Sequence, residues 1–401
     1  MNKIRTVCIF FLFFSINKTG TAQSNLPTGK LTLKQCIETA INNHLDVQQS
    51  SLLMQTSKIN RNQAKLNMLP DLNGSAGTGI NQGRSIDPFT NGYINQQVNY
   101  SSYGLSSGVV LFNGLSMQNI AKQNALAYEA SKMDWQQAKD NLTINIILAY
   151  LQVLSNEDLL VQLRSQEALS KKQVERLEVL NKEGAILPSQ LYDLKGQYAN
   201  DQLSIISGNN ALELSRISLC QYMNIPYDKN MQLERLDAES YATKYDDTVD
   251  KIYQESLQQF SLVKAVDLRK QSAERGVRAA KGQLFPTLSL NGNANTNYSS
   301  AARNDIFLNT TDVTSNDYVV ISGIPTPVIR KQSNFNSEKI NYNKQLNNNL
   351  FTSVSLNLRV PLFNSLQQRN RIKLAQLTLK NNDLVAKTTK TQLQQSIEAG
   401  L

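Results

Sequence analysis

One pattern occurs twice along the chain, and it constrains the fold more than any other feature. Residues 37–72 align with residues 253–288 at a constant offset of 216 and without a gap. Further on, Leu111-Phe112-Asn113 recurs as Leu362-Phe363-Asn364 at an offset of 251. Self-similarity of this kind indicates two copies of one structural unit. The larger second offset predicts an insertion of 35 residues in the second copy, within the Asn-, Ser- and Thr-rich segment 299–349.

Each half predicts the order helix, strand, loop, strand, helix. The first helix is expected over 32–68, because Pro70 disfavours a helical conformation at the residue before it. After each such helix the sequence alternates between apolar and polar residues, as it does again in 354–362. Nine or so alternating residues are what a tilted strand needs to cross a bilayer. We therefore expect β-hairpins over 70–113 and 286–364.

For any one of these strands, a soluble sheet with one face on a core is the simpler interpretation. Four strands in two similar hairpins, with nothing else to cover their apolar faces, favour a membrane. Aromatic residues are expected to form an interfacial belt, namely Phe89, Tyr93, Tyr100 and Tyr103. The expected lipid-facing residues of the last strand are Val354, Leu356, Leu358 and Val360.

A long helical hairpin is predicted over 115–223. Residues 115–183 contain neither Pro nor Gly, and apolar residues recur at helical spacing, so about 69 residues would form a helix of roughly 100 Å. The segment from Gly184 to Pro188 breaks this helix, and a second one is expected from Ser189 to Met223. A helix of that length indicates a coiled coil or a helical tube.

The N-terminus has the three parts of a secretory signal peptide. Lys3 and Arg5 precede an apolar run over 7–16, and small residues at 20–22 suit cleavage after Ala22. A retained anchor is the alternative, but this run is too short to span a bilayer. After residue 22 no 18 consecutive apolar residues occur, so no transmembrane helix is expected. The net charge of +9 on an exported chain does not favour a nucleic-acid partner.

The residues needed for catalysis or metal binding are scarce. The single His, His44, aligns with Phe260 in the repeat, which favours packing over catalysis. Cys36 and Cys220 are expected to be buried small hydrophobes rather than a redox pair or metal ligands. The glycine-rich stretch 74–79 lies inside a strand, where glycines are expected to allow a bend or twist. We expect no enzyme activity, no cofactor and no metal site.

The duplicated plan resembles the TolC family of outer-membrane efflux channels over nearly the whole mature chain. The most specific match is Ala149-Tyr150-Leu151-Gln152-Val153-Leu154, followed by Asp158 and Leu160. Gly184 falls at the family's helical-hairpin tip, and Gln197-Tyr198 follows at the family's spacing. Leu31-Thr32-Leu33 with Ala40 is similar to the family's first helix, and Leu69-Pro70-Asp71-Leu72 to the start of its barrel.

The resemblance implies an α+β membrane protein. Three chains would each give four strands to one outer-membrane β-barrel, which a long periplasmic α-helical barrel continues. A barrel of several chains is also physically required, because four strands cannot close by themselves and an open sheet edge is not tolerated in lipid. The implied function is a passive conduit in a tripartite efflux or type I secretion system, with an inner-membrane efflux pump or ABC exporter. The implied contacts for a periplasmic adaptor protein are Gly184, Ala185, Ile186 and Leu187, and for each of them a simple turn between helices is the alternative. A soluble periplasmic coiled-coil or adhesin-like protein is the alternative.

These patterns also predict the organisation of the chain. Residues 1–22 are the expected signal peptide, 23–226 the first repeat, 227–249 a linker, and 250–401 a second repeat. The second repeat is incomplete, because its long helix stops near the counterpart of Tyr150 and the return helix is missing. We expect the sequence to be a fragment that lacks roughly 70–80 residues by comparison with its own first half. No gate residue can be named.

Overall fold

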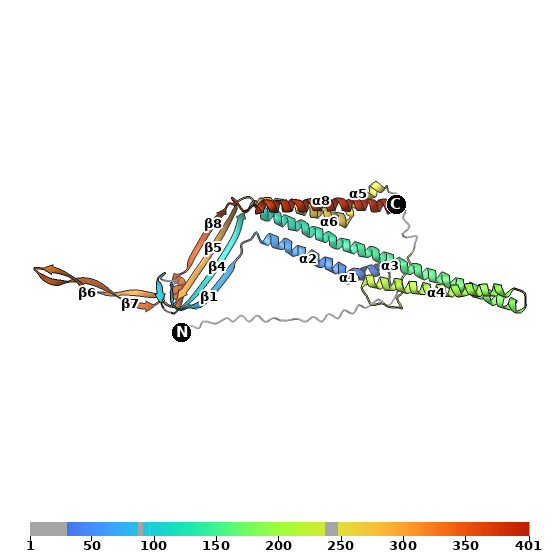
Figure 1. Cartoon of the computed structure of the whole chain (residues 1–401), viewed down its shortest axis with the longest axis horizontal. Helices are drawn as coiled ribbons and strands as arrows, with labels where there is room; N and C mark the ends of the chain where they lie inside the picture. The colour runs from blue at the N-terminus through green and yellow to red at the C-terminus, as the bar shows by residue number, and fades with distance from the viewer. Residues whose placement is uncertain (1–29, 87–90, 96, 237–247, 401) are drawn as a thin grey trace. The chain divides into compact units, whose positions relative to one another are not determined.

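The computed structural model describes residues 30–86, 91–95, 97–236 and 248–400. The predicted signal peptide, Phe89 and residues 237–247 of the predicted linker lie outside these ranges. The chain divides into two compact units, one of residues 1–45 with 140–244 and one of residues 46–139 with 245–401. Figure 1 traces the elements of both units along the chain. By composition the fold is α+β, with 59% of the described residues in helices and 25% in strands, which confirms the predicted α+β class.

The first unit is built from helices. Its elements are α1 (Leu33–Asn43), the C-terminal part of α3 (Ser116–Lys182) and α4 (Pro188–Met223). The helix α3 is continuous over 67 residues and therefore belongs to both units. Thr32 caps α1 in a complete capping box with Gln35. The helix α4 begins with Pro188 at its first turn, one residue before the predicted start.

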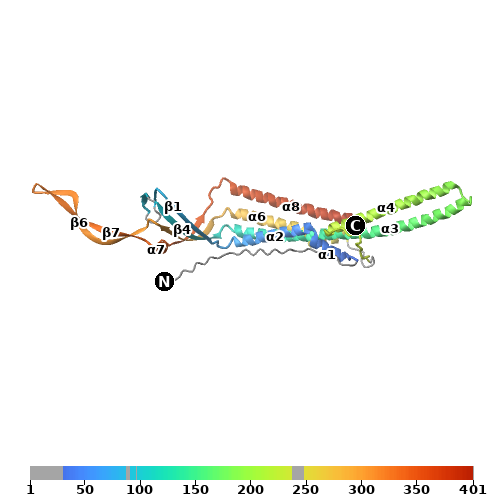
Figure 2. The same cartoon turned by 90° about the horizontal axis from the view of Figure 1, so that it is seen from below.

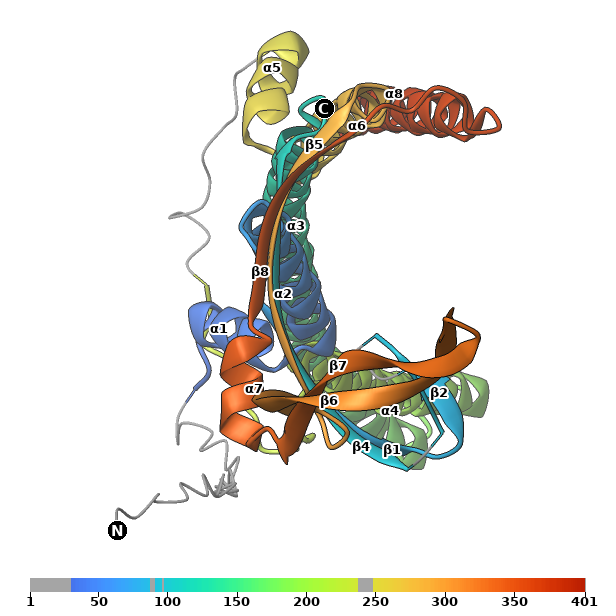
Figure 3. The ribbon, with the colours of Figure 1, turned by 90° about the vertical axis from the view of Figure 1, so that its left-hand side faces the viewer.

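One antiparallel sheet of four strands forms the centre of the second unit. Its strands are β1 (Asn73–Asn81), β4 (Val98–Phe112), β5 (Thr287–Ser299) and β8 (Phe351–Arg359). The spatial order is β1-β4-β5-β8, so the two predicted hairpins pair with each other through β4 and β5. Figure 3 shows these strands as one curved layer.

Two smaller hairpins connect the strands of the sheet. The strands β2 (Arg84–Ile86) and β3 (Tyr93–Asn95) form a short hairpin between β1 and β4. The strands β6 (Arg303–Ile321) and β7 (Ile324–Lys339) form a long hairpin between β5 and β8. Both lie where the sequence predicts loops. The polar segment that was predicted as an insertion therefore contains regular structure.

The remaining helices of the second unit are α2 (Leu45–Leu66), α5 (Val249–Gln259), α6 (Ser261–Gly282), α7 (Tyr342–Asn348) and α8 (Gln367–Gly400). Figure 2 shows α6 beside α8. Ion pairs join these two helices: Lys390 Nζ lies 2.9 Å from both carboxylate oxygens of Asp267, and Lys270 Nζ lies 2.7 Å from Asp383 Oδ1. Lys270 lowers the pKa of Asp383 by hydrogen bonding, with Lys387 as a second donor.

The prediction of one continuous helix over 32–68 is wrong. His44 is extended, with φ −68° and ψ 126°, and separates the 11 residues of α1 from the 22 of α2. Phe260, its aligned residue, is extended in the same way, with φ −64° and ψ 123°, between the 11 residues of α5 and the 22 of α6. In both places the amide of the break still donates to the carbonyl four residues earlier. His44 itself is half-buried.

The absence of a membrane-spanning helix was predicted from unbroken apolar runs, and a broader criterion gives a different result. Within the described residues, α3 contains one window of 18 residues with a mean hydropathy of 1.3, apolar enough by composition to cross a membrane. Only 28% of that window is buried. One such helix is weak support for a membrane span, because a helix with apolar residues on two faces passes the same test.

Candidate functional surfaces

The sheet has one apolar and one polar face. Residues paired across an antiparallel sheet project from the same face, so the register decides how the alternating patterns combine. Apolar residues meet in the rows Gly74–Leu105–Ala294, Val109–Leu290–Leu356 and Phe112–Leu288–Leu358. Polar residues and glycines meet in the rows Asn73–Ser106–Asn293–Ser353 and Gly108–Asn291–Ser355, and in Ser75–Gly104–Asn295, a row that ends on β8 with the apolar Phe351. All four patterns therefore add up to one two-faced surface.

The apolar face is exposed where it reaches β8. Val354, Leu356 and Leu358 lie on it and are 80%, 61% and 66% exposed. Val360 was predicted to continue the strand, but β8 ends at Arg359 and Val360 follows it. Among the described residues, β1 and β8 each pair with one neighbour only, so both edges of the sheet have unpaired backbone groups. An apolar face and two open edges require covering by something else.

The glycines of β1 and β4 make room for side chains of the polar face. A Cβ on Gly104 would lie 2.8 Å from both Asn295 Oδ1 and Ser75 Oγ, and one on Gly79 would lie 2.7 Å from the hydroxyl of Tyr100. The strand β1 pairs regularly over all nine residues. Besides the expected bend or twist, which this pairing does not test, the glycines therefore have a second role, because they admit cross-strand neighbours.

The aromatic belt differs from the prediction. Tyr100 lies over Gly79 on the polar face and so does not point outward. Tyr103 is on the apolar face, and its hydroxyl lies 2.8 Å from that of Tyr342 on α7. Tyr298 packs against Tyr342 with ring centroids 4.7 Å apart and the ring planes tilted by 52°. Sequence reasoning missed Tyr298, although it continues the alternation of β5.

The helix α7 is fixed to the end of β5 by hydrogen bonds. Gln345 is 1% exposed, accepts from the amide of Ser299 at 3.0 Å, and donates to the carbonyls of Ser299 and Ile340. Thr296 Oγ1 donates to the carbonyl of Leu346 at 2.6 Å. These bonds hold the returning chain against the sheet before β8 begins.

The repeated Leu-Phe-Asn marks the same backbone turn in both halves. After Asn113, Gly114 and Leu115 have φ of 65° and 61°, and after Asn364 the next two residues have φ of 52° and 62°. The amides three residues beyond each Asn donate to its carbonyl, at 3.2 and 3.0 Å. Two consecutive left-handed residues are rare, so the tripeptide precedes a specific junction between strand and long helix.

At its far end, α3 closes in a Schellman motif. Gly184 has φ 74°, its amide donates to the carbonyl of Asn181 at 3.1 Å, and the amide of Ala185 donates to that of Leu180 at 2.9 Å. Of the predicted tip residues, Gly184 and Ala185 are exposed, Ile186 is half-buried, and Leu187 is 67% exposed. The tip belongs to the first unit and the lipid-facing candidates to the second.

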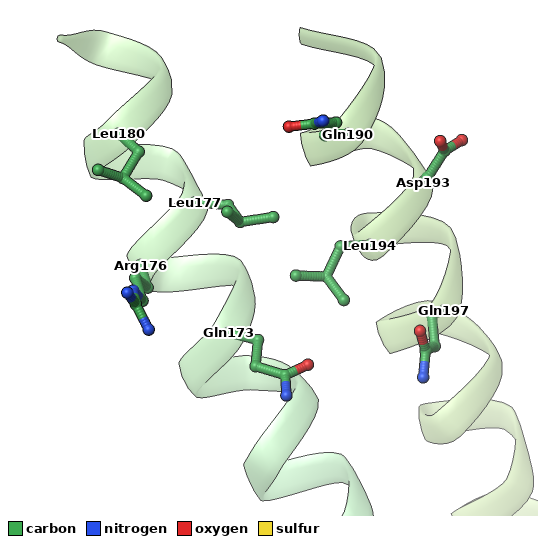
Figure 4. Close-up of a pocket in the computed structure, with 8 residues that line it drawn as sticks. All are labelled: Gln173, Arg176, Leu177, Leu180, Gln190, Asp193, Leu194 and Gln197. Atoms are coloured by element: carbon green, nitrogen blue, oxygen red, sulfur yellow. The ribbon is translucent and has the colours of Figure 1, made fainter. Parts of the chain in front are cut away.

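Next to the tip, α3 and α4 enclose a groove of about 590 Å³. Its lining residues are Gln173, Arg176, Leu177, Leu180, Gln190, Asp193, Leu194 and Gln197. Figure 4 shows Leu177 and Leu194 pointing toward each other between the helices. Sequence reasoning did not find this groove, because the residues of its two walls are 10 to 24 positions apart in the sequence.

Tyr150 of the Ala-Tyr motif closes the other end of the first unit. Leu31 and Leu233 form an isolated parallel bridge, and the hydroxyl of Tyr150 lies 3.0 and 2.6 Å from the carbonyls of Leu31 and Glu234. The ring is fully buried. Burial is the main cause that raises the pKa of Tyr150 to about 12.

Cys36 and Cys220 are free and buried, with exposed fractions of 0% and 2%. Burial raises the pKa of Cys36 to about 11, so its thiol stays protonated and unreactive. The described residues contain no group of three His, Cys, Asp or Glu side chains placed to hold a metal ion.

Comparisons with known proteins place this fold. No family model and no curated protein matches the sequence. Solved structures do match: the outer membrane protein VceC from Vibrio cholerae aligns with a TM-score of 0.69 and 12% identity, over 90% of this chain and 75% of its own. The CmeC outer membrane channel of Campylobacter jejuni aligns at 0.67 and 14%, over 90% and 68%. The MtrE outer membrane channel of Neisseria gonorrhoeae aligns at 0.67 and 11%, over 92% and 72%.

The fold is that of TolC-family outer-membrane channels. This confirms the resemblance stated from the sequence motifs. At identities of 11–14% the likeness establishes the TolC fold, and the function of this chain has to be argued from its own surfaces.

Proposed function

We propose that the chain is one third of an outer-membrane channel with the TolC fold. The observation that carries the proposal is the two-faced sheet with two unpaired edges. In a bilayer every backbone group must be paired, so four strands have to be completed by others. Three copies of the order β1-β4-β5-β8, with β8 of one copy beside β1 of the next, would close a barrel of twelve strands.

The rows of the sheet define the two sides of that barrel. The apolar face carries Val354, Leu356 and Leu358 toward lipid, with Val360 just beyond the strand. The polar face, rich in Asn, Ser and Gly, would line a water-filled lumen. A polar lining without charged rows suits a passive conduit, because it provides hydration without a specific site for a substrate.

Internal duplication is a further part of the proposal. Equal helix lengths, the extended breaks at His44 and Phe260, and the paired left-handed turns after Asn113 and Asn364 recur at the two sequence offsets. Such agreement in backbone detail supports two copies of one unit rather than a chance likeness of sequence. Each copy would contribute one hairpin to the barrel and one long helix to a periplasmic tube.

The surface of α3 supports the helical tube. Leu142, Ile146, Tyr150 and Val153 are buried on one side of the helix. On another side Ile144, Leu148 and Leu151 are 45–60% exposed at helical spacing. A second apolar stripe on a single helix is expected where neighbouring copies pack side by side.

The helical tip is the proposed contact for a periplasmic adaptor protein, which would connect the channel to an inner-membrane pump or ABC exporter. Leu187 gives an exposed apolar side chain at the end of the hairpin, and the groove beside Leu177 and Leu194 lies next to it. In a cell that exports through this channel, Leu187→Glu should abolish export but leave assembly intact. Leu187→Met, which keeps the apolar surface, is the control and should export normally.

Assembly is tested by membrane fractionation and by the mass of the detergent-solubilised particle. The proposal predicts a protein of the outer membrane, extracted only by detergent, with the mass of three chains. A water-soluble periplasmic monomer would refute it and would favour the coiled-coil or adhesin-like alternative.

A further inference from the structure

The long hairpin of β6 and β7 ends in an unusually apolar tip. A two-residue turn, Ser322-Gly323 with φ of 53° and 84°, joins the strands in the type I′ geometry. Residues 318–329, which we call the apolar tip, contain no charged residue. Seven of their side chains are aliphatic or aromatic, and all seven are between 36% and 68% exposed.

Both faces of the apolar tip are apolar. The pairs Ile321–Ile324 and Val319–Thr326 project from one face, and the pairs Val320–Pro325 and Tyr318–Pro327 from the other. A protein that binds one face of a two-stranded ribbon leaves the opposite face in water. Immersion in an apolar medium covers both faces at once, so the tip fits a lipid layer better than a flat protein partner.

The prolines of β7 lower the cost of such immersion. Ile321 and Ile324 close the turn as a hydrogen-bonded pair, and bonded and non-bonded pairs then alternate along the hairpin. Pro325 and Pro327 fall at non-bonded positions, where any other residue would direct its amide away from the partner strand. An unpaired amide is expensive in hydrocarbon, and proline has none.

The length and charge of the hairpin agree with one leaflet. Three residue steps separate Ile321 from Tyr318, a distance of about 10 Å along the strand, and five steps separate Ile324 from Ile329, a distance of about 17 Å. Half of a hydrocarbon core is about 15 Å thick. Asp317 and Arg330 mark the end of the uncharged stretch. Four basic and four acidic residues over 303–339 leave the hairpin without net charge, so its partner need not be anionic.

We propose that the apolar tip inserts into the hydrocarbon layer of a lipid bilayer. The hairpin starts beyond the end of β5 that lies away from α6, and Figures 1 and 2 show it running on from the sheet. The inference goes beyond the channel function, since only the hairpin takes part, and its test rests on the proposed placement of the sheet in a bilayer. Insertion would attach the protein to a membrane through a second element besides its sheet.

The experiment places an environment-sensitive fluorophore on the protein held in lipid nanodiscs. Ile321→Cys carries the label in protein without residues 1–22, which removes Cys8, and buried Cys36 and Cys220 remain unlabelled. Ser333→Cys, in the polar part of the same hairpin, is the control position. Phosphatidylcholine with a quencher on its acyl chains is supplied either in separate vesicles or in the discs themselves.

Insertion predicts blue-shifted, lipid-quenched emission for the label at 321 and water-like emission at 333. Quenching by lipid in separate vesicles would mean that the tip enters another membrane, and quenching by lipid in the discs would mean that it enters its own. Emission at 321 that is water-like in both arms overturns the proposal. A blue shift without lipid quenching also overturns it, because the tip would then be covered by protein, such as a second copy of the chain.

A charge variant gives a second measurement that leaves the type I′ turn in place. Ile321→Asp should lower the lipid partition of the tip roughly 100-fold, the factor that corresponds to an Asp in hydrocarbon. Ser333→Asp should leave it unchanged. Partition should also be the same on neutral and anionic vesicles. Equal partition of the two Asp variants would overturn the proposal even if both fold normally.

Discussion

Leu356→Arg tests which face of the sheet contacts lipid. Leu356 is central in β8 and continues the apolar row Val109–Leu290. An Arg at the bilayer midplane of a barrel costs about 2–4 kcal/mol, so the folding equilibrium in lipid should fall roughly 30- to 900-fold per chain. Urea titration of folding into phosphatidylcholine vesicles, followed by the heat-modifiable mobility of the folded form in gels, measures this change.

Ser355→Arg is the matched control, because it places the same charge at nearly the same depth on the opposite face. Its neighbours are Asn291 and, beyond that, Gly108, which leaves space for a long side chain. We expect a change below about 1 kcal/mol, since a lumen-facing charge stays hydrated. Leu358→Arg, close to the strand end, should fall between the two. Equal destabilisation by the variants at 355 and 356 would refute the assignment of the faces.

Three further predictions concern the helices. Tyr150→Phe should reduce the free energy of unfolding by about 1 kcal/mol in chemical denaturation, because it removes one buried hydrogen bond and leaves the packing intact. In the native protein, the raised pKa of Tyr150 predicts a free energy of unfolding that is constant below pH 10 and declines as the pH rises toward 12. Gly282→Ala should lower the free energy of unfolding by more than about 2 kcal/mol, because its Cβ would lie 2.6 Å from a backbone carbonyl oxygen. Gly276→Ala meets only a flexible side chain and should raise the free energy of unfolding by up to about 1 kcal/mol in the same assay. Because Lys270 lowers the pKa of Asp383, the contact of α6 with α8 should weaken as the pH falls through that depressed pKa. In a pH series of thermal melts Asp383→Asn should reduce this acid dependence, while the pair of Asp267 with Lys390 still joins the two helices.

The elements with strong periodicity were predictable from the sequence. Four alternating strands, the long helix and its break at Gly184 follow from local rules about side-chain spacing, Gly and Pro. The break at His44 was missed, because neither Gly nor Pro accompanies it and one extended residue leaves the apolar spacing almost unchanged. Only the register of the assembled sheet could show that Tyr100 lies over a glycine rather than at a membrane boundary.

The hairpin of β6 and β7 was missed for a different reason. A strand that packs on no core has nothing to impose alternation, so its sequence lacks the pattern that predicts a strand. The role of Tyr150 was likewise invisible, although its motif was recognised. Its hydrogen-bond partners, Leu31 and Glu234, are more than 80 residues away in the sequence.

The conductance of the purified protein in a planar lipid bilayer tests the central claim most directly. If three copies close a polar-lined barrel, addition of the detergent-solubilised particle should produce discrete, uniform and ohmic steps of current. The Leu356→Arg protein, which should not assemble in lipid, should produce none. A wild-type protein that binds the bilayer without any step of current would contradict the account.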